Sequence, residues 1–298
     1  MYRKVVILCL FILVFSCAKN KTIDSSSSLS FGTDETLDIL TWNLENFPKQ
    51  DNITINFLAE LIDSLNVDII AMQEIESETD FNNLLDKLDD WEGYRANSAY
   101  YNIDLAYLYK SNLIIKNINE IEELNDYNLT RTPLLIEVFF GGQSIYIINN
   151  HYKCCGNGAI KNIYSDEEYR RQQACFLTKN YIDSNLDDQN VILLGDFNDE
   201  LMDPDSSNVF DVFIKDDKNY QFVDMGIAFG SSTNWSYPGF PSHLDHILIT
   251  NELFDEFDNT LSTVQIIHVE DYFEGGWNEY VNFISDHRPV GLKLNFNQ

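Results

Sequence analysis

The chain has 298 residues, of which 44% are hydrophobic and 13% aromatic, and this composition excludes an intrinsically disordered protein. That length is enough for one large hydrophobic core or two small ones. The formal net charge of −29 is strongly acidic, and its repulsion opposes the binding of a polyanion. A phosphate-bearing substrate would therefore require a divalent cation or a local group of basic side chains.

The first residues carry the pattern of a secretion signal. Arg3 and Lys4 precede an apolar run over residues 5–15 that is too short to span a bilayer. The segment Leu13-Val-Phe-Ser-Cys17 resembles a bacterial lipobox, in which the cysteine becomes lipid-modified. We therefore predict a lipoprotein signal peptide over residues 1–16 and a lipid anchor at Cys17, in preference to an ordinary secretory signal or a buried strand. The protein is then expected in a bacterial cell envelope, facing the periplasm or the cell surface.

Residues 17–36 are rich in serine, threonine, aspartate, asparagine and lysine, which predicts a flexible tether. No later apolar run is long enough for a transmembrane helix, so we expect the lipid anchor to be the only membrane contact. The rest of the chain contains neither an internal repeat nor an interdomain linker. A single domain over residues 37–298, acting as a monomer, is the simplest interpretation.

Strand-like and helix-like segments alternate along this domain. Apolar residues recur at helical spacing over 53–65 and 81–88, and 166–184 is the longest helix candidate, with acidic residues at its start. Apolar runs predict strands over 37–42, 68–73, 105–109, 134–140, 144–150, 191–194, 244–250, 263–268 and 290–296. Gly141 and Gly142 predict a hairpin, so the sheets are expected to be at least partly antiparallel. The pattern favours an α/β domain.

Three cysteines remain once the signal peptide and the anchor are set aside, namely Cys154, Cys155 and Cys175. An odd number is unusual in an oxidising compartment. We predict a disulfide from Cys154 or Cys155 to Cys175, and a bond between Cys154 and Cys155 is the alternative. A cysteine-based metal site is disfavoured because no paired CxxC spacing exists.

Polar residues end or follow the predicted strands in a repeated manner. They are Asn43, Glu74, His151, Asp196 with Asn198, Asp245, and Asp286 with His287. Carboxylates, amides and imidazoles are costly to leave unpaired at the rim of a sheet. Because each lies at the same end of a different strand, we expect one shared site that faces hard cations and phosphate oxygens.

The local motifs around these residues are specific as a set. They are Thr41-Trp-Asn-Leu-Glu-Asn46, Gln73-Glu74, His151, Gly195-Asp-Phe-Asn-Asp199 and Ser285-Asp-His-Arg-Pro289. In this order they resemble the endonuclease/exonuclease/phosphatase superfamily, which has the DNase I-like fold. The matches span nearly the whole mature chain, which is identified as a secreted bacterial lipoprotein member of that superfamily.

The resemblance implies a four-layer α/β sandwich, in which two mostly antiparallel mixed sheets pack face to face with helices outside. It also implies a bound Mg2+ or Mn2+ and hydrolysis of a phosphate ester. The metal ligands that it implies are Asn43, Glu74 and Asp286, and the catalytic residues are His151, Asp196, Asn198, Asp245 and His287. In this scheme Glu74 is the principal ligand, Asp245 pairs with His287, and Asp196 and Asn198 orient the attacking water and the phosphoryl oxygens.

We predict a metal-dependent phosphoesterase, and specifically a nuclease acting on phosphodiester bonds of nucleic acid outside the cytoplasm. A sphingomyelinase-type phospholipase C and a small-molecule phosphatase are the alternatives within the superfamily, and a non-catalytic surface binding protein is a further one. Residues 272–283 are rich in aromatic side chains. They form either a covered hairpin or a lip that stacks on bases or enters a lipid interface.

Three residues near the motifs have less certain roles. His246 should point to the opposite face of its strand from Asp245, so we leave it out of the site. Arg170 and Arg171 lie on the long predicted helix. They are either solvated helix charges or part of a rim that faces phosphate.

Overall fold

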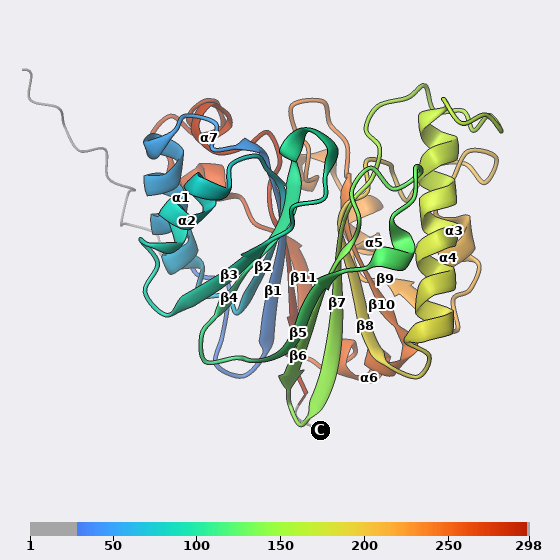
Figure 1. Ribbon diagram of the computed structural model, residues 1–298, viewed down its shortest axis with the longest axis horizontal. Helices are drawn as coiled ribbons and strands as arrows, with labels where there is room; N and C mark the ends of the chain where they lie inside the picture. The colour runs from blue at the N-terminus through green and yellow to red at the C-terminus, as the bar shows by residue number, and fades with distance from the viewer. Residues whose placement is uncertain (1–28, 297–298) are drawn as a thin grey trace, which may run out of the picture.

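A computed structural model describes residues 29–296 (Figure 1). The predicted signal peptide, the Cys17 anchor and most of the predicted tether lie outside the described residues. Within the described range, no helix combines the length and the apolar character needed to cross a membrane.

The first sheet has six strands in the order β11-β12-β1-β2-β4-β3. All neighbours are antiparallel except β1 and β2, which are parallel. The strands are β1 (Leu37–Phe47), β2 (Ile69–Ile75), β3 (Trp91–Arg95), β4 (Asp104–Lys110), β11 (Thr263–Ile266) and β12 (Val290–Leu294).

The second sheet also has six strands, in the order β5-β6-β7-β8-β10-β9, and only β7 and β8 are parallel. The predicted hairpin is confirmed, since Phe140 pairs with Gln143 across Gly141 and Gly142, both of which have positive φ. The strands are β5 (Ile114–Glu120), β6 (Leu134–Phe140), β7 (Gln143–His151), β8 (Asn190–Asp196), β9 (Tyr220–Phe222) and β10 (Asp245–Thr250).

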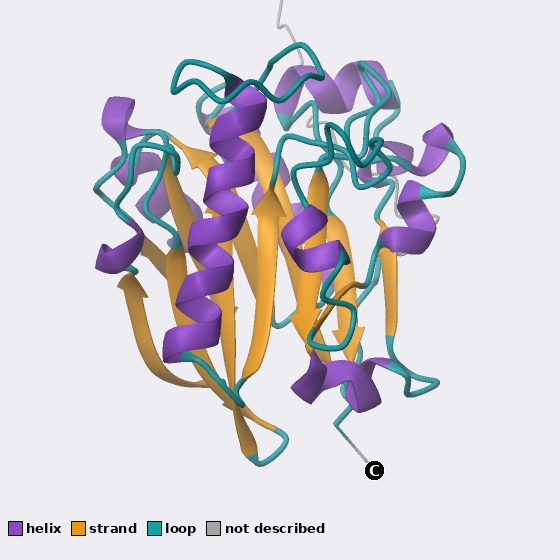
Figure 2. Ribbon diagram, turned by 90° about the vertical axis from the view of Figure 1, so that its right-hand side faces the viewer, coloured by secondary structure: helices purple, strands orange, loops and turns teal. Residues whose placement is uncertain are grey.

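Helices cover the outer faces of both sheets, with α1 and α2 outside the first and α3 and α4 outside the second (Figures 1 and 2). The predicted four-layer sandwich is therefore confirmed. The α-helices are α1 (Asn52–Leu65), α2 (Glu78–Leu85), α3 (Glu167–Asn185), α4 (Asp211–Ile214), α5 (Met225–Ala228), α6 (Phe254–Phe257) and α7 (Trp277–Phe283). The short 3-10 helices are η1 (Tyr100–Asn102), η2 (Glu122–Leu124), η3 (Ser232–Asn234), η4 (Asn251–Leu253) and η5 (Val269–Tyr272).

Two of the α-helices, α3 and α2, begin with a side-chain cap. The Asp166 side chain accepts a hydrogen bond from the Tyr169 amide at the start of α3, where Glu167 and Glu168 also favour the positive end of the helix dipole. Ser77 caps α2 in the same way by accepting from the Asp80 amide. These caps fix where each helix begins relative to the strand before it.

Successive side chains of a strand pack alternately into two different hydrophobic cores. In β1, Ile39 faces the layer between the two sheets, whereas Leu40 packs with α1 and α2 outside the first sheet. In β8, Leu194 faces the inter-sheet layer and Leu193 packs against α3 and α4. Strands buried on both faces read as continuous apolar runs, which is why β8 was predictable from its sequence.

Two βαβ units determine where the functional side chains meet. The units β1-α1-β2 and β7-α3-β8 each contain the one parallel pair of their sheet. The carboxyl ends of these four strands carry Asn43, Glu74, His151 and Asp196. Asp245 opens the antiparallel strand β10 directly opposite Asp196, so it lies at the same end. The facing sheets therefore bring all these residues to one edge of the sandwich.

A buried polar bridge joins the two sheets beneath that edge. The Gln73 amide donates to Asn149 Oδ1 over 2.7 Å, and the Asn149 amide donates to the carbonyls of Met72 and Ala106. Polar groups buried between two apolar sheets are tolerated only when they are paired. The bridge thus fixes the register of one sheet against the other just below the site.

Two sequence-based interpretations need correction. The packed part of the chain begins by Leu29 rather than at residue 37, because Leu29 and Phe31 are buried in the core outside the first sheet. The aromatic segment 272–283 runs from the last residue of η5 through α7 instead of forming a hairpin or a lip. Phe273 and Tyr280 are buried in the same core, and Trp277 is partly buried against it.

Candidate active site

The structure brings together the residues that the sequence predicted. Glu74, His151, Asp196, Asn198, Asp286 and His287 line one cavity of about 660 Å³. Asn43 and Asp245 are buried at its floor, where they bond to residues of that set. All eight predicted side chains therefore belong to a single site.

Asp245 and His287 form the strongest pair in the site. His287 Nδ1 lies 2.7 Å from Asp245 Oδ2, and both side chains are buried. Burial disfavours the charged imidazole, but the Asp245 and Asp196 carboxylates outweigh it and raise the pKa of His287 to about 10. The other nitrogen, Nε2, lies 4.0 Å from Asp196 Oδ2 and 3.9 Å from Asp286 Oδ1. His287 therefore presents a charged N–H to the centre of the cavity.

Asn43 connects two carboxylates that come from different sheets. Its amide nitrogen donates to Asp196 Oδ2 over 2.9 Å and to Glu74 Oε1 over 3.3 Å. His151 Nε2 approaches the same two oxygens, at 3.5 Å from Asp196 and 3.8 Å from Glu74. Glu74 Oε1 and Asp196 Oδ2 thus converge on a common point. In this arrangement the amide oxygen of Asn43 accepts from the Glu45 amide, so metal ligation by Asn43 stays a prediction.

Irregular backbone turns two of these side chains into the cavity. Glu74 has a φ of 62°, in a stretch where the pairing of β2 with β4 shifts register. Asn198 has a φ of 56° and donates its amide to Asp196 Oδ1 over 3.0 Å. A glutamate in the left-handed region is costly, and such residues concentrate at functional sites. The bulge directs Glu74 towards Asp196 and His151.

The site has an excess of buried negative charge that suits a divalent cation. Burial first and the Asp245 charge second raise the pKa of Asp196 to about 7. Asp245 Oδ1 is buried without a hydrogen-bond partner among the described residues. Oxygen donors from Glu74 and Asp196, which both line the cavity, are the ligands that Mg2+ and Mn2+ accept alongside water. The donor set therefore fits such an ion, and the Asn43 amide bonds to both carboxylates.

Asp286 lies at the rim of the site. Its side chain is partly exposed and lies 3.9 Å from His287 Nε2. The loop that carries it is fixed from below, because Ser285 Oγ donates to the Asn43 carbonyl over 2.6 Å and accepts from the His287 amide. Asp286 is thus positioned beside the phosphate-facing nitrogen of His287 without being bonded to Glu74.

Arg131 is a residue of the site that sequence reasoning missed. Its guanidinium donates to the Ile103 carbonyl and to Thr130 Oγ1, and it lines a second cavity next to Glu74 and His151. Burial lowers the pKa of Arg131, and the charges of Glu74 and Asp196 oppose that shift, so it faces the catalytic carboxylates. No strand-end pattern marks it, because it lies in the loop before β6.

Arg171 has a structural role. It is buried, pairs with Asp199 at 2.8 Å, and donates to the carbonyls of Lys153 and Cys155. These bonds hold the loop after His151 against α3. A buried, fully engaged guanidinium is not available to a phosphate, so the phosphate-rim interpretation is wrong for Arg171.

The predicted disulfide to Cys175 is not formed, and all three thiols are free. Cys175 lies on α3 with its side chain buried in the core, where burial raises the pKa of its thiol. Cys154 and Cys155 are exposed beside the cavity, with their Sγ atoms 3.0 Å apart. The loop is held to α3 by Arg171 rather than by a covalent bond.

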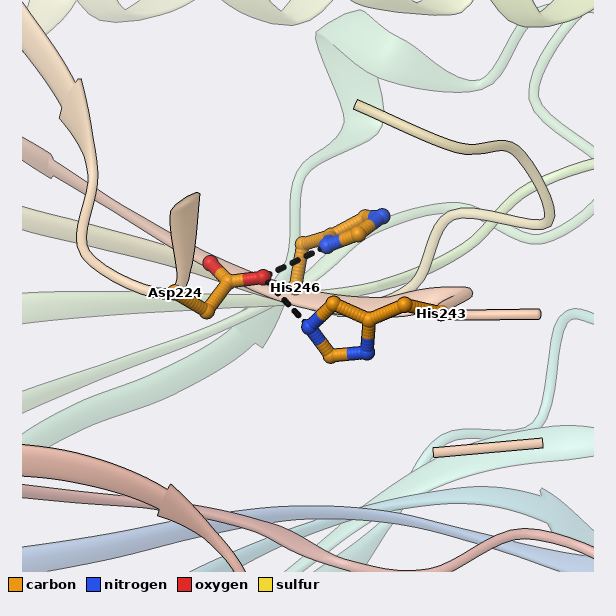
Figure 3. Close-up of side chains that lie close together, drawn as sticks. All are labelled: Asp224, His243 and His246. Atoms are coloured by element: carbon orange, nitrogen blue, oxygen red, sulfur yellow. Dashed lines mark hydrogen bonds and ion pairs between the residues drawn. The ribbon is translucent and has the colours of Figure 1, made fainter. Parts of the chain in front are cut away.

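Asp224, His243 and His246 form a second buried cluster (Figure 3), and His246 contacts rings of the core outside the second sheet. His246 Nδ1 lies 2.6 Å from Asp224 Oδ2, and its Nε2 lies 2.9 Å from the Asp199 carbonyl. Because both partners can only accept, His246 carries a proton on each nitrogen. Burial opposes that charge, yet Asp224 raises the pKa of His246. As predicted, His246 points away from the catalytic cavity.

His243 completes this cluster and connects it to the site. Its Nε2 lies 2.9 Å from Asp224 Oδ2, and its Nδ1 contacts Ser236 Oγ, which accepts from the Asp245 amide. Asp224, His243 and His246 are close enough to hold a metal ion. However, His246 Nδ1 and Asp224 Oδ2 lie 2.6 Å apart, which is the distance of a direct charge-assisted hydrogen bond, so we interpret the cluster as a charged scaffold for β10.

The fold and the site together define a class of protein: hydrolases in which carboxylates and histidines meet at one end of two facing sheets to bind a metal and a phosphoester. The chain belongs to the Endonuclease/Exonuclease/phosphatase family, whose model matches residues 40–287. This membership supports a divalent-metal-dependent phosphoesterase. A search of curated proteins finds no match.

Solved structures with the same fold are distant in sequence. TDP2 from D. rerio, complexed with single strand DNA product, is 16% identical, with a TM-score of 0.65 over 88% of this chain and 100% of that one. An endonuclease/exonuclease/phosphatase from Bacteroides vulgatus is 13% identical, with a TM-score of 0.62 over 88% and 99%. A mannosyl-6-phosphatase from Bacteroides thetaiotaomicron is 15% identical, with a TM-score of 0.58 over 87% and 99%.

Proposed function

We propose that the protein is a divalent-metal-dependent phosphodiesterase that hydrolyses nucleic acid outside the cytoplasm. The observation that carries the proposal is the convergence of Glu74, Asp196, His151 and His287 in one cavity. A structural neighbour with single strand DNA product, TDP2, supports nucleic acid as the substrate class. We further propose anchoring to the cell envelope through Cys17, which predicts that Cys17→Ala moves the protein from the membrane fraction to the soluble one.

The side chains divide the chemistry between them. His287, held at Nδ1 by Asp245, donates from Nε2 to a phosphoryl oxygen and stabilises the charge that develops there. Asp196 and Asn198 line the cavity beside His151 and His287, where they can orient an attacking water and the phosphoryl oxygens. The Asn198 amide fixes the orientation of that carboxylate. A divalent cation at Glu74 and Asp196 would neutralise the non-bridging oxygens and the leaving oxygen.

His151 acts in the neutral form. Burial first, and the charges of Arg131 and His287 next, hold the pKa of His151 well below its ordinary value. Its Nε2 therefore faces Glu74 and Asp196 without adding a positive charge that would compete with the metal. A neutral imidazole at this position is suited to a hydrogen bond with the water or the phosphoryl group.

A small-molecule phosphatase is the second candidate, because further carboxylates line the catalytic cavity. Glu45, Asp199, Glu200 and Asp203 are among its lining residues and can accept hydrogen bonds from the hydroxyl groups of a sugar. A neighbour of this fold is a mannosyl-6-phosphatase. The sphingomyelinase alternative has less support, since two of the aromatic residues that suggested a lipid-facing lip, Phe273 and Tyr280, are buried in the core and Trp277 packs against it.

Metal removal tests the proposal directly. EDTA is expected to abolish hydrolysis of bis(4-nitrophenyl) phosphate and of single-stranded DNA, and Mg2+ or Mn2+ to restore it. Because bound cation relieves the repulsion among buried carboxylates, added Mn2+ should also raise the melting temperature of the wild type. The Glu74→Gln variant should lose this increase, whereas Glu76→Gln, which changes an exposed neighbour outside the cavity, should keep it.

Either of two results would contradict the metal site: hydrolysis that survives chelation, or an equal Mn2+ response in both variants. A substrate panel separates the two candidate functions. Hydrolysis of sugar phosphates with no activity on any phosphodiester would favour the phosphatase.

A further inference from the structure

A second cavity, of about 650 Å³, opens beside the catalytic one and shares Glu74 and His151 with it. Its other charged side chains are all basic, namely Arg131, Lys153 and Arg170. The sign of this local charge is opposite to that of the whole chain, in which 48 acidic residues outnumber 19 basic ones. A local excess of positive charge against such a background is what an anionic ligand requires.

Tyr127 provides a flat, fixed surface at the rim of this cavity. The Arg170 guanidinium lies over the ring, 4.2 Å from its centroid, and donates to the Tyr127 carbonyl. The Tyr164 ring meets the same ring edge-on at 6.3 Å. Even so, Tyr127 remains 61% exposed. An exposed ring held in place by its neighbours is a suitable platform for stacking a nucleobase, and the arginine strengthens that stack.

The two cavities are electrostatically opposite. Beyond the catalytic residues, the catalytic cavity is also lined by Asp199, Glu200 and Asp203, and its one arginine, Arg171, is already paired with Asp199. Successive backbone phosphates would be attracted on the Tyr127 side and repelled on the other. A long strand that crossed both cavities would meet that repulsion, whereas a strand end would not.

Resting on the phosphodiesterase function proposed above, we propose that the Tyr127 cavity is a subsite for the terminal nucleotide of a single strand. The base stacks on Tyr127 beside Arg170, and the adjoining phosphate is held by Arg131 and Lys153. The scissile phosphate then lies at Glu74 and His287, and the group on its other side is short. The enzyme accordingly acts at strand ends rather than within a chain.

Steady-state kinetics on two substrates of one sequence test the proposal: a linear single-stranded oligonucleotide and its covalently closed circle. The wild type should degrade the linear strand from its end and leave the circle intact. Tyr127→Leu should raise KM for the linear strand roughly tenfold with little change in kcat, because stacking contributes to binding. Tyr127→Phe keeps the ring and should behave as the wild type. Phe229→Leu, which removes an exposed ring outside both cavities, is the matched control and should leave KM unchanged.

Direct binding separates this subsite from the catalytic proposal. Isothermal titration of dAMP into the whole protein in EDTA should give a Kd that Tyr127→Leu weakens roughly tenfold and Phe229→Leu does not. Equal cleavage of the circle and the linear strand, or a Kd for dAMP that Tyr127→Leu does not change, would overturn the subsite. Either result would still be consistent with a phosphodiesterase. If dAMP binds through Tyr127 but no phosphodiester is cleaved, the subsite stands and the proposed function fails.

Discussion

Asp245→Asn is expected to lower kcat by at least ~10²-fold with the fold intact. In the wild type, Asp245 Oδ2 accepts from His287 Nδ1 over 2.7 Å and sustains the charged imidazole at a pKa of about 10. A neutral amide cannot hold the proton there, so Nε2 loses the positive charge that it presents to the phosphoryl group. His287→Ala should cause a loss of at least the same size. Single-turnover kinetics with saturating Mg2+ measure the effect.

The control for this pair is His268→Ala, which removes an imidazole with a carboxylate partner, Glu270, outside the catalytic cavity. Its turnover should match the wild type. A further signature is non-additivity: the double variant of Asp245 and His287 should be little worse than His287→Ala alone, because the two residues act as a unit. Near-wild-type turnover in Asp245→Asn would show that the pair does not act in catalysis.

Asp224→Asn is expected to destabilise the protein by about 3–5 kcal/mol, which is the usual cost of leaving one charge of a buried pair without its partner. Asp224 is buried and lies against His246 at 2.6 Å and His243 at 2.9 Å. Burial alone would raise the pKa of Asp224, but the charge of His246 and the hydrogen bonds outweigh it and lower the pKa. Urea denaturation of the two proteins gives the difference in the free energy of unfolding.

The pKa shifts of Asp224 and His246 determine how the free energy of unfolding changes with pH. The lowered pKa of Asp224 stabilises the fold above the ordinary carboxyl value of about 3.9, and this contribution is lost as the pH falls further. The raised pKa of His246 stabilises the fold below about 6.5, and this contribution is lost as the pH rises through the folded value. The difference between wild type and Asp224→Asn should therefore be largest between roughly pH 4 and 6.5.

Asp216→Asn is the matched control, since Asp216 pairs with Lys179 at 2.9 Å nearer the surface. Such pairs contribute less than about 1 kcal/mol. A difference for Asp224→Asn that is as small as this, or that does not change with pH, would contradict the charged pair.

The sequence predicted the fold and most of the site for a specific reason. Buried strands such as β8 are recognisable in the sequence as apolar runs. A carboxylate that follows such a run, as Asp196 does, is seldom required for packing. Glu74 and His151 follow their strands in the same manner. When several strands end in such polar residues, and the motifs occur in the order typical of a known family, the sequence pattern is enough to predict that these residues meet at one edge of the sheets.

Other features depend on contacts that no local pattern records. Arg131 faces the catalytic carboxylates from a loop, and its role follows only from packing beside Glu74. The partner of His246, Asp224, lies at the end of a short strand far away along the chain. Arg170 and Arg171 are adjacent in sequence, yet one covers the Tyr127 ring and the other is buried against Asp199.

Burial was the least predictable property. The polar composition around Leu29 and Phe31 suggested a tether, but two apolar residues suffice to dock that stretch on the first sheet's outer core. The aromatic density of residues 272–283 suggested exposure at a lip, whereas Tyr280 lies in the core and accepts a hydrogen bond from Trp42 Nε1 over 3.0 Å. Composition alone does not distinguish an apolar surface from an apolar core.

The pairing of β1 with β12 joins the first strand of the domain to the last. On the ribosome, β1 emerges early but has no neighbour on that side until residues 290–294 have been made. His287, which immediately precedes β12, reaches the cavity at the same late moment. We therefore expect the nascent polypeptide to lack hydrolytic activity until β12 has been made. A chain that ends before β12 should be inactive and should expose an open sheet edge, which favours aggregation.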